Sequence, residues 1–369
     1  MLTFPELNPP TCRGRFFKLP PNRVWRSYQG GRTLDEIAGD ENPADGHFPE
    51  DWIASLTAAS NPVPSSPDEG LSAVELDGKK HLLRDLIAVD PLHFLGRAHL
   101  DHFGPNPHIL VKFLDSAIRL HFQVHPSREF ARRFLDAPSG KTEAYHVLGV
   151  RPGHEGVLWL GFQRPPSRGE LRRMIEAQDI PALKACFDPV RVRPGDTFIV
   201  PGGTPHALGS GLFVVEMQEP SDLVVRFEFE RGGYVLPESA RFMKRGLDFC
   251  LDIFDLAPRP LTDTGNPFKC APARSRALSA QSREDDLINS EFFRMKKLRV
   301  ADTVTLAPDS FTLAIVTSGA CRATALSSGY SATLSPYEKI VLPAALGPLR
   351  LDPLAHAEIL LCQPPVPSF

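Results

Sequence analysis

The chain has 369 residues and a formal net charge of −3, and 42% of its residues are hydrophobic while 23% are charged. These values are close to the globular average, so they argue against a disordered chain and a strongly basic nucleic-acid binder. The length is enough for two domains. No apolar run approaches the ~20 residues of a membrane span, and residues 1–6 lack the features of an export signal. We therefore expect a cytoplasmic protein that binds neither nucleic acid nor membranes.

Two residue counts narrow the fold class. Proline accounts for 37 residues, about twice its usual share of roughly 5%. This excess favours short strands and turns over long helices. The six cysteines are scattered and form no C-x-x-C pair, so we expect no disulfide or zinc-finger framework.

The first two thirds of the chain alternate short strands with a few helices. Apolar and β-branched runs predict strands at 109–113, 121–124, 145–150, 157–162, 197–200, 211–218 and 223–229. Helices are predicted at 82–87, 127–135, 167–187 and 237–256. Ser127 is a candidate N-cap, and Ser167 with Glu170 has the spacing of a capping box.

A proline-rich joint at 258–272 precedes a second group of predicted strands at 311–316, 331–334, 339–342 and 357–361. Residues 335–343 repeat the layout of residues 193–201, as two related β-barrels or sandwiches would. We therefore predict a mainly β protein. Its parts are an N-terminal domain at 1–235 with a helical insert at about 167–187, a helical segment and joint at 236–265, and a C-terminal domain at 266–369.

The most informative stretch is 195–206, which fits G-x5-P-x-G-x2-H at every specified position. This is the second motif of the cupin barrels, whose jelly-roll fold we expect for both domains. A turn glycine starts a strand, proline and glycine bend the chain at its end, and His206 is presented inward from a rigid element, as a metal site needs. Ser210 stands where the motif usually has asparagine.

A first cupin motif is visible upstream. Gln123 and His125 are two positions apart, so on a strand both side chains share a face. Together with Glu143 and His206 they offer two imidazoles, a carboxylate and an amide oxygen. That donor set suits zinc or another divalent first-row metal. The C-terminal domain has His356 as its one histidine, and we expect no metal there.

Several blocks taken together resemble the type I phosphomannose isomerases (mannose-6-phosphate isomerases). The blocks are residues 50–55, 110–115, 123–126, 140–143, 201–206, 211–218 and 221–226. The resemblance covers about residues 25–254, whereas the C-terminal part matches in layout only.

The resemblance implies a specific site. The ligands of one zinc ion per chain would be Gln123, His125, Glu143 and His206. The catalytic groups would be Arg226, Lys141 and Glu216, and the substrate would contact Lys141, Arg226 and Ser55. The reaction would interconvert mannose 6-phosphate and fructose 6-phosphate through an enediol.

Residue chemistry agrees with that reaction. Moving a carbonyl from C1 to C2 requires removal of the proton beside it, and nearby cations stabilise the enediolate that forms. Lys141 beside a dication should lose its proton more easily, and Glu216 is a second candidate base; the sequence does not rank them. Arg226 stays charged, so it fits contact with an oxyanion or phosphate.

Two other functions remain open at this point. One is an iron dioxygenase that uses His125, His206 and Glu143, against which Gln123 and Lys141 argue. The other is a non-catalytic sugar-binding or regulatory cupin. The chain also departs from the family in three regions that shape the substrate pocket: Asp51 replaces serine, Trp25 is separated from Gly30-Gly31, and residues 227–233 read Phe-Glu-Phe-Glu-Arg-Gly-Gly instead of an aromatic–Asp–aromatic run.

Overall fold

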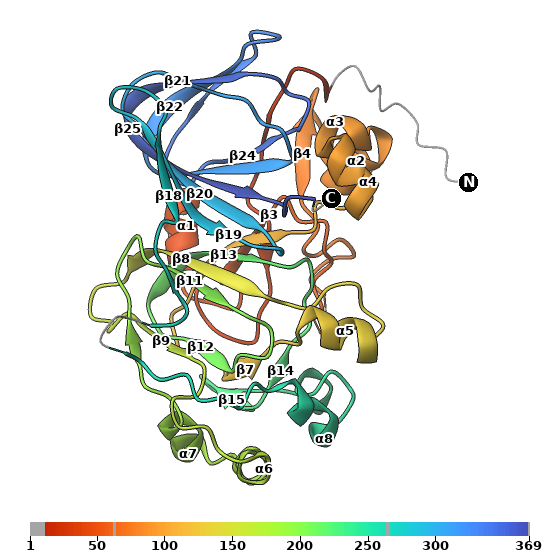
Figure 1. Ribbon diagram of the computed structural model, residues 1–369, viewed down its shortest axis with the longest axis vertical. Helices are drawn as coiled ribbons and strands as arrows, with labels where there is room; N and C mark the ends of the chain where they lie inside the picture. The colour runs from red at the N-terminus through yellow and green to blue at the C-terminus, as the bar shows by residue number, and fades with distance from the viewer. Residues whose placement is uncertain (1–11, 62–63, 263–265, 368–369) are drawn as a thin grey trace.

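Two β-barrels stacked end to end form the body of the molecule, with helices on the outside (Figure 1). The structure is a computed structural model that describes residues 12–61, 64–262 and 266–367. Residues 1–6, on which the expectation about export rests, lie outside these ranges. The mainly β, cupin-type architecture expected from the sequence is confirmed.

The N-terminal barrel is built from two antiparallel sheets. The smaller has the order β10 (Val190–Arg191), β9 (Val157–Leu160), β12 (His206–Leu208), β7 (Gln123–Val124) and β14 (Val225–Arg226). The larger has the order β17 (Lys269–Cys270), β11 (Thr197–Val200), β8 (Glu143–Val150), β13 (Leu212–Gln218), β6 (Leu110–Asp115), β3 (Glu50–Ile53) and β2 (Arg23–Val24). A cluster of buried apolar side chains, among them Phe198 and Val214, fills part of the space between the sheets.

The C-terminal barrel is one curled antiparallel sheet. Its order is β1 (Phe17–Lys18), β24 (Lys339–Leu342), β22 (Thr312–Ala325), β25 (Leu349–Gln363), β20 (Arg294–Val300), β19 (Arg283–Asn289) and β18 (Arg274–Ala277). Beside this path, β21 (Val304–Leu306) pairs with β25, and β23 (Ser331–Leu334) pairs with β22. Its interior is apolar, with Leu298, Val316 and Ile359 in one buried cluster.

Short helices and hairpins surround the barrels. The α-helices are α1 (Arg32–Ala38), α2 (Leu83–Val89), α3 (Pro91–Leu95), α4 (Arg97–Phe103), α5 (Arg128–Phe134), α6 (Arg168–Ala177), α7 (Ile180–Ala185) and α8 (Leu247–Cys250). The 3-10 turns are η2 (Glu238–Ala240) and η3 (Leu251–Ile253), and the hairpins are β4 (Ala73–Leu76) with β5 (Lys79–Leu82) and β15 (Glu230–Arg231) with β16 (Tyr234–Val235). None of the described helices is long and apolar enough to cross a membrane.

The helix predictions had different outcomes. Ser127 caps α5, and Ser167 with Glu170 forms the expected capping box at the start of α6. The one or two helices predicted at 237–256 are present as the short pieces η2, α8 and η3. Met243 and Lys244 both have positive φ values, of 50° and 60°, which end any helix in this segment.

The two barrels exchange edge strands. Strand β1 pairs with β24 of the C-terminal sheet, in the register Phe17↔Val341. Strand β17 pairs with β11 of the N-terminal sheet, in the register Thr197↔Cys270. Residues 17–18 and 269–270 therefore each lie in the sheet of the other domain, and the predicted boundaries at 235 and 266 stay a prediction.

Candidate active site

Three side chains that could bind a metal ion meet at the inner face of the N-terminal barrel. His206 begins β12 and pairs with Gln123 of β7, and His125 follows β7 directly. Glu143 begins β8, in the facing sheet. One ligand atom from each of His125, Glu143 and His206 lies within 4.8 Å of the others.

The glycines of the 195–206 motif allow the turn to approach its neighbour closely. A Cβ on Gly202 would lie 2.5 to 2.8 Å from backbone atoms of Ser127 and Pro126. Gly203 has a φ of +93°, a conformation that L side chains rarely adopt, and its N–H donates to the carbonyl of His125 at 2.7 Å. The motif therefore holds the two histidine-bearing segments together.

The two imidazoles are oriented by the backbone. Nδ1 of His125 lies 2.8 Å from the carbonyl oxygen of Leu223, and Nδ1 of His206 lies 2.9 Å from that of Thr204. Each Nδ1 therefore donates to a backbone oxygen, and each Nε2 is directed toward Glu143. Burial, assisted by Lys141, lowers the pKa of His125 to about 3, so this ring is the neutral form that metals bind.

The donor set fits a divalent cation. Nε2 of His206 lies 3.0 Å from Oε1 of Glu143, and Nε2 of His125 lies 3.3 Å from Oε2 of the same carboxylate. The side-chain amide of Gln123 lies 3.2 Å from Nε2 of His206. Two imidazole Nε2 atoms and a carboxylate thus face one another in a buried site, an arrangement that a shared cation stabilises.

Lys141 lies directly beside this cluster. Its Nζ is 2.8 Å from Oε2 of Glu143, 3.0 Å from Nε2 of His125 and 3.3 Å from Oε1 of Glu216. Burial acts to lower the pKa of Lys141, but Glu143 and Glu216 outweigh it and raise that pKa. The expectation of a lowered pKa depended on a bound dication, and the protein's own groups act in the opposite direction.

A buried charge network extends from Lys141 and includes residues that the sequence analysis missed. Nζ of Lys112 lies 3.5 Å from both Glu216 and Glu50. Glu50 also accepts hydrogen bonds from Arg26 at 2.8 Å and Trp52 at 2.7 Å. The signal for Lys112 was a single lysine in the apolar run 110–114, since a fully buried lysine requires a partner.

The pKa values of Glu50 and Glu216, two carboxylates of this network, are shifted in opposite directions. Burial disfavours ionised Glu50, but Arg26 and Lys112 outweigh it and hold the pKa of Glu50 below its usual range. Burial raises the pKa of Glu216, although Lys112 and Lys141 act against this. Glu216 is therefore the carboxylate of this group that is better suited to hold a proton.

Arg226 lines two neighbouring cavities. The inner cavity, of about 30 Å³, is also lined by Lys112, Lys141, Glu216, His121 and His125, and the outer one, of about 480 Å³, by Ser60, Asn61, Ser239 and Lys244. Arg226, Asp222 and Val224 line both. Among the residues that the structure describes, no carboxylate lies within ion-pair distance of Arg226, whose side chain donates to the carbonyl of Ala240 at 3.2 Å.

Ser55 lines neither cavity in this structure, and its contact with substrate stays a prediction. The side chain is 1% exposed, and its Oγ donates to the carbonyl of Thr57 and accepts the N–H of the same residue, both at 3.1 Å. The hydroxyl therefore serves a local turn.

One departure from the family pattern has a structural explanation. Glu228, in the altered 227–233 run, forms two bonds of 2.7 Å to the guanidinium of Arg119 and accepts the N–H of Phe122 at 3.0 Å. Its carbonyl oxygen lies 3.0 Å from Nδ1 of His121, a buried residue that lines the inner cavity. The carboxylate of Glu228, in the run that departs from the family pattern, is thus held by Arg119 and Phe122 and does not line the inner cavity.

Sequence comparison finds relatives of this chain among mannose-6-phosphate isomerases. The chain is 29% identical over 269 residues to a mannose-6-phosphate isomerase of Streptococcus mutans, covering 71% of this chain and 78% of that protein. It is 33% identical over 140 residues to the mannose-6-phosphate isomerase ManA of Bacillus subtilis, covering 38% of this chain and 41% of that protein. No family model matches the chain.

Solved structures share the fold over nearly the whole length. A mannose 6-phosphate isomerase from Bacillus subtilis aligns with a TM-score of 0.73 and 19% identity, covering 94% of this chain and 99% of that one. A zinc-bound mannose 6-phosphate isomerase aligns with a TM-score of 0.71 and 17% identity, covering 95% and 99%. At these identities the structural likeness establishes the fold.

The two barrels and the buried His–Glu–His cluster define a metal-binding protein of the bicupin type. The sequence relatives are mannose-6-phosphate isomerases, and residues 25–254 resemble the same family.

Proposed function

We propose that the protein is a zinc-dependent aldose–ketose isomerase that interconverts mannose 6-phosphate and fructose 6-phosphate. The observation that carries this proposal is the cluster of His125, Glu143 and His206, buried beside Lys141, Lys112 and Glu216. A metal ligand set next to buried acid–base groups is what a carbonyl migration requires.

Gln123, His125, Glu143 and His206 would hold the ion, with Gln123 turned to present its amide oxygen. When bound, a divalent ion there supplies polarisation of the sugar carbonyl and stabilisation of negative charge beside it. The backbone carbonyls of Leu223 and Thr204 keep both rings in the ligating orientation.

The outer cavity suits the phosphate end of the substrate. Its cations, Arg226 and Lys244, face a space of about 480 Å³, and Ser60, Asn61 and Ser239 supply polar contacts. The inner cavity holds an ion or water but not a sugar. Entry of the reacting end therefore requires movement of the shared wall, of which Arg226 is the cationic member.

Proton transfer between C1 and C2 is assigned to the buried groups of the inner cavity. Glu216 and Lys141 are 3.3 Å apart, so a proton held by one can be passed to the other without crossing solvent. Lys112 fixes the opposite side of Glu216 at 3.5 Å. The cationic side chains of Lys141, Lys112 and Arg226 stabilise the enediolate in a site that excludes water.

The test is a coupled assay for fructose 6-phosphate formed from mannose 6-phosphate, with zinc-loaded protein and a chelator-treated control. Turnover that the chelator abolishes and zinc restores supports the proposal. If metal is bound at about one ion per chain and no turnover is seen, the sugar assignment is wrong, and unphosphorylated mannose and other aldoses are the next substrates. Oxygen consumption by iron-loaded protein would instead support a dioxygenase.

A further inference from the structure

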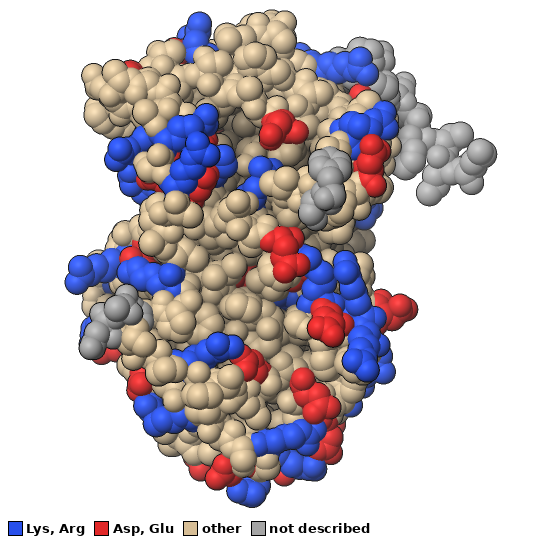
Figure 2. Space-filling view, viewed as in Figure 1, with Lys and Arg blue, Asp and Glu red and all other residues tan. Residues whose placement is uncertain are grey.

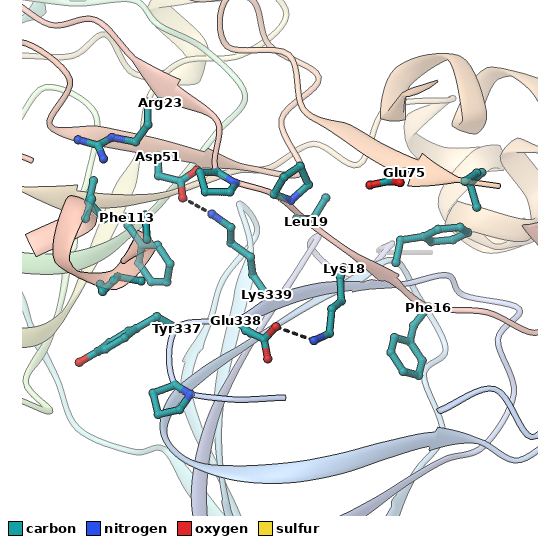
Figure 3. A pocket seen from close by; sticks show the side chains of 18 of the residues that line it. Phe16, Lys18, Leu19, Arg23, Asp51, Glu75, Phe113, Tyr337, Glu338 and Lys339 are labelled. Atoms are coloured by element: carbon teal, nitrogen blue, oxygen red, sulfur yellow. Dashed lines mark hydrogen bonds and ion pairs between the residues drawn. The ribbon is translucent and has the colours of Figure 1, made fainter. Parts of the chain in front are cut away.

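A buried ion pair joins the C-terminal barrel to a strand of the catalytic barrel. Lys339, at the start of β24, contacts Asp51 in the middle of β3 through its ammonium group (Figure 3). The two residues are 5% and 4% exposed. The second carboxylate oxygen of Asp51 accepts the N–H of Asn22 at 2.8 Å. The pair lies on the wall of an interdomain cavity of about 560 Å³.

Asp51 lies directly behind the catalytic cavity. Successive side chains of a strand point to opposite faces, and its neighbours Glu50 and Trp52 bond to each other on the face toward the inner cavity. On β6, the same alternation separates Phe113 from Lys112. Asp51 pairs in register with Phe113, and Trp52 pairs with Lys112.

Lys339 contacts both Asp51 and Phe113, the paired residues on the side of β3 and β6 that faces away from the inner cavity. Besides its contact with Asp51, its ammonium lies 5.5 Å from the ring centroid of Phe113. A single side chain of the C-terminal barrel therefore holds the two strands whose opposite faces carry Glu50 and Lys112. Figure 3 shows Lys339 pointing from β24 toward Asp51, with Phe113 beside it.

We propose that Lys339 is a positioning residue for the catalytic site. Through Asp51 and Phe113 it sets the position of β3 against β6, and so the distances among Glu50, Lys112 and Glu216 on the far side. This inference rests on the proposed isomerase function. It gives the C-terminal barrel, which has no metal ligands of its own among its described residues, a defined part in catalysis.

The face of β3 and β6 that carries Glu50 and Lys112 has little tolerance for displacement. Lys112 is 3.5 Å from each of two carboxylates, one on β3 and one on β13. A shift of β3 by a fraction of an ångström changes which carboxylate the ammonium favours. Misplacement by 1 Å can lower a rate by roughly 10²-fold, so a partial loosening should lower kcat by about ten-fold. The metal ligands lie on other strands and should keep their affinity.

The chain offers a matched control. Lys18 of β1, an edge strand of the C-terminal sheet, forms an ion pair of 2.5 Å with Glu338 on the rim of the same cavity. It is more exposed than Lys339, and its strand carries none of the site residues. Lys18 pairs in register with Ile340, the residue that follows Lys339. Lys18→Met therefore removes a neighbouring ion pair without touching β3.

The experiment compares Lys339→Met, Lys339→Arg, Lys18→Met and the double variant Asp51→Asn/Lys339→Met at a temperature at which circular dichroism shows each to be folded. We measure kcat, KM, bound zinc, and hydrogen–deuterium exchange of the peptides that contain β3 and β6. The double variant leaves no unpaired buried charge, so it carries the test if Lys339→Met does not fold.

We expect Lys339→Met and the double variant to lose about ten-fold in kcat, with zinc content and KM within about two-fold of the parent protein, and to exchange faster in β3. Lys339→Arg should recover most of the activity, and Lys18→Met should match the parent. The proposal is overturned if the folded double variant keeps the parent kcat and the parent exchange in β3. An inactive parent protein would instead refute the isomerase function, while the exchange data still test the positioning.

Discussion

The two barrels have similar layouts but different interiors. In the N-terminal barrel, Lys112, Glu143 and Glu216 are each at most 3% exposed, and the strands beside the metal ligands are as short as two or three residues. The C-terminal barrel encloses leucine, valine and alanine, and its strands β22 and β25 run for 14 and 15 residues.

This difference shows how one architecture serves two purposes. Strand ends and turns present ligands to a common point, whereas an uninterrupted strand buries every second side chain in a continuous core. Buried charges cost desolvation energy, and the apolar barrel contributes stability that offsets it. Function and stability are therefore unequally divided along the chain.

The largest contrast should come from removing a histidine in each barrel. His206→Ala should lose bound zinc and lower kcat/KM by roughly 10³-fold, because a bound divalent ion contributes several kcal/mol to transition-state stabilisation. His356→Ala, in the exposed middle of β25, should change neither. Metal content by mass spectrometry and the coupled assay check both. Retention of zinc by His206→Ala would remove it from the ligand set.

A lysine from each barrel gives the next contrast. Lys141→Met should lower kcat by about 10²-fold, the scale of a lost acid–base or charge-stabilising group, and it should keep its zinc. Lys296→Met in the C-terminal barrel, where the lysine pairs with Glu284 at 3.1 Å, should leave kcat unchanged. Steady-state kinetics on zinc-quantified protein decide this; near-parent turnover in Lys141→Met would contradict the assigned role.

Shortening a core side chain of the C-terminal barrel should lower stability without lowering activity. Leu298 is fully buried in the C-terminal barrel. Leu298→Ala should lower the free energy of unfolding by about 2–5 kcal/mol, the usual cost of such a cavity. Its kcat should stay within about two-fold of the parent under conditions in which it is folded. Urea unfolding and the coupled assay are the measurements, and a large fall in kcat would show that this core also shapes the site.

The smallest expected effect concerns the free energy of unfolding at acidic pH. The pKa of Glu50 is depressed in the folded protein, so its ionisation stabilises the fold above the usual carboxylate range, and that contribution is lost as the pH falls below about 4.5. Glu50→Gln should therefore weaken the dependence of unfolding free energy on pH between about 5 and 3, by up to about 1.4 kcal/mol per pH unit. Glu338→Gln, at the half-exposed pair with Lys18, is the control.

The sequence predicted those parts of the site that depend on local spacing. The glycines and His206 of the 195–206 motif, and the alternation of Gln123 and His125, are short-range patterns, and the structure brings these side chains together with Glu143. The strands at 331–334 and 339–342 also have the predicted limits.

The parts that could not be predicted depend on contacts between distant segments. Lys112 meets Glu50 and Glu216 only through the register of β6 with β3 and β13, which no local pattern reveals. Ser55 matched its block in type but is used by a turn. The apolar residues at 242–254 predict one or two helices, and the left-handed backbone at Met243 and Lys244 confines the helical pieces to the segments on either side of it.

The pairing of β1 with β24 has a consequence for how the protein is made. Lys18 and Glu338, at this junction, are 320 positions apart. At about 5–20 residues per second, a ribosome needs roughly 15–60 s to synthesise the intervening chain. For that time β1 has no partner, whereas every strand of the N-terminal barrel, β17 included, precedes residue 271. A nascent chain that stalls between residues 271 and 339 therefore carries all four candidate metal ligands and an unpaired strand edge, which makes it a substrate for chaperones or for aggregation.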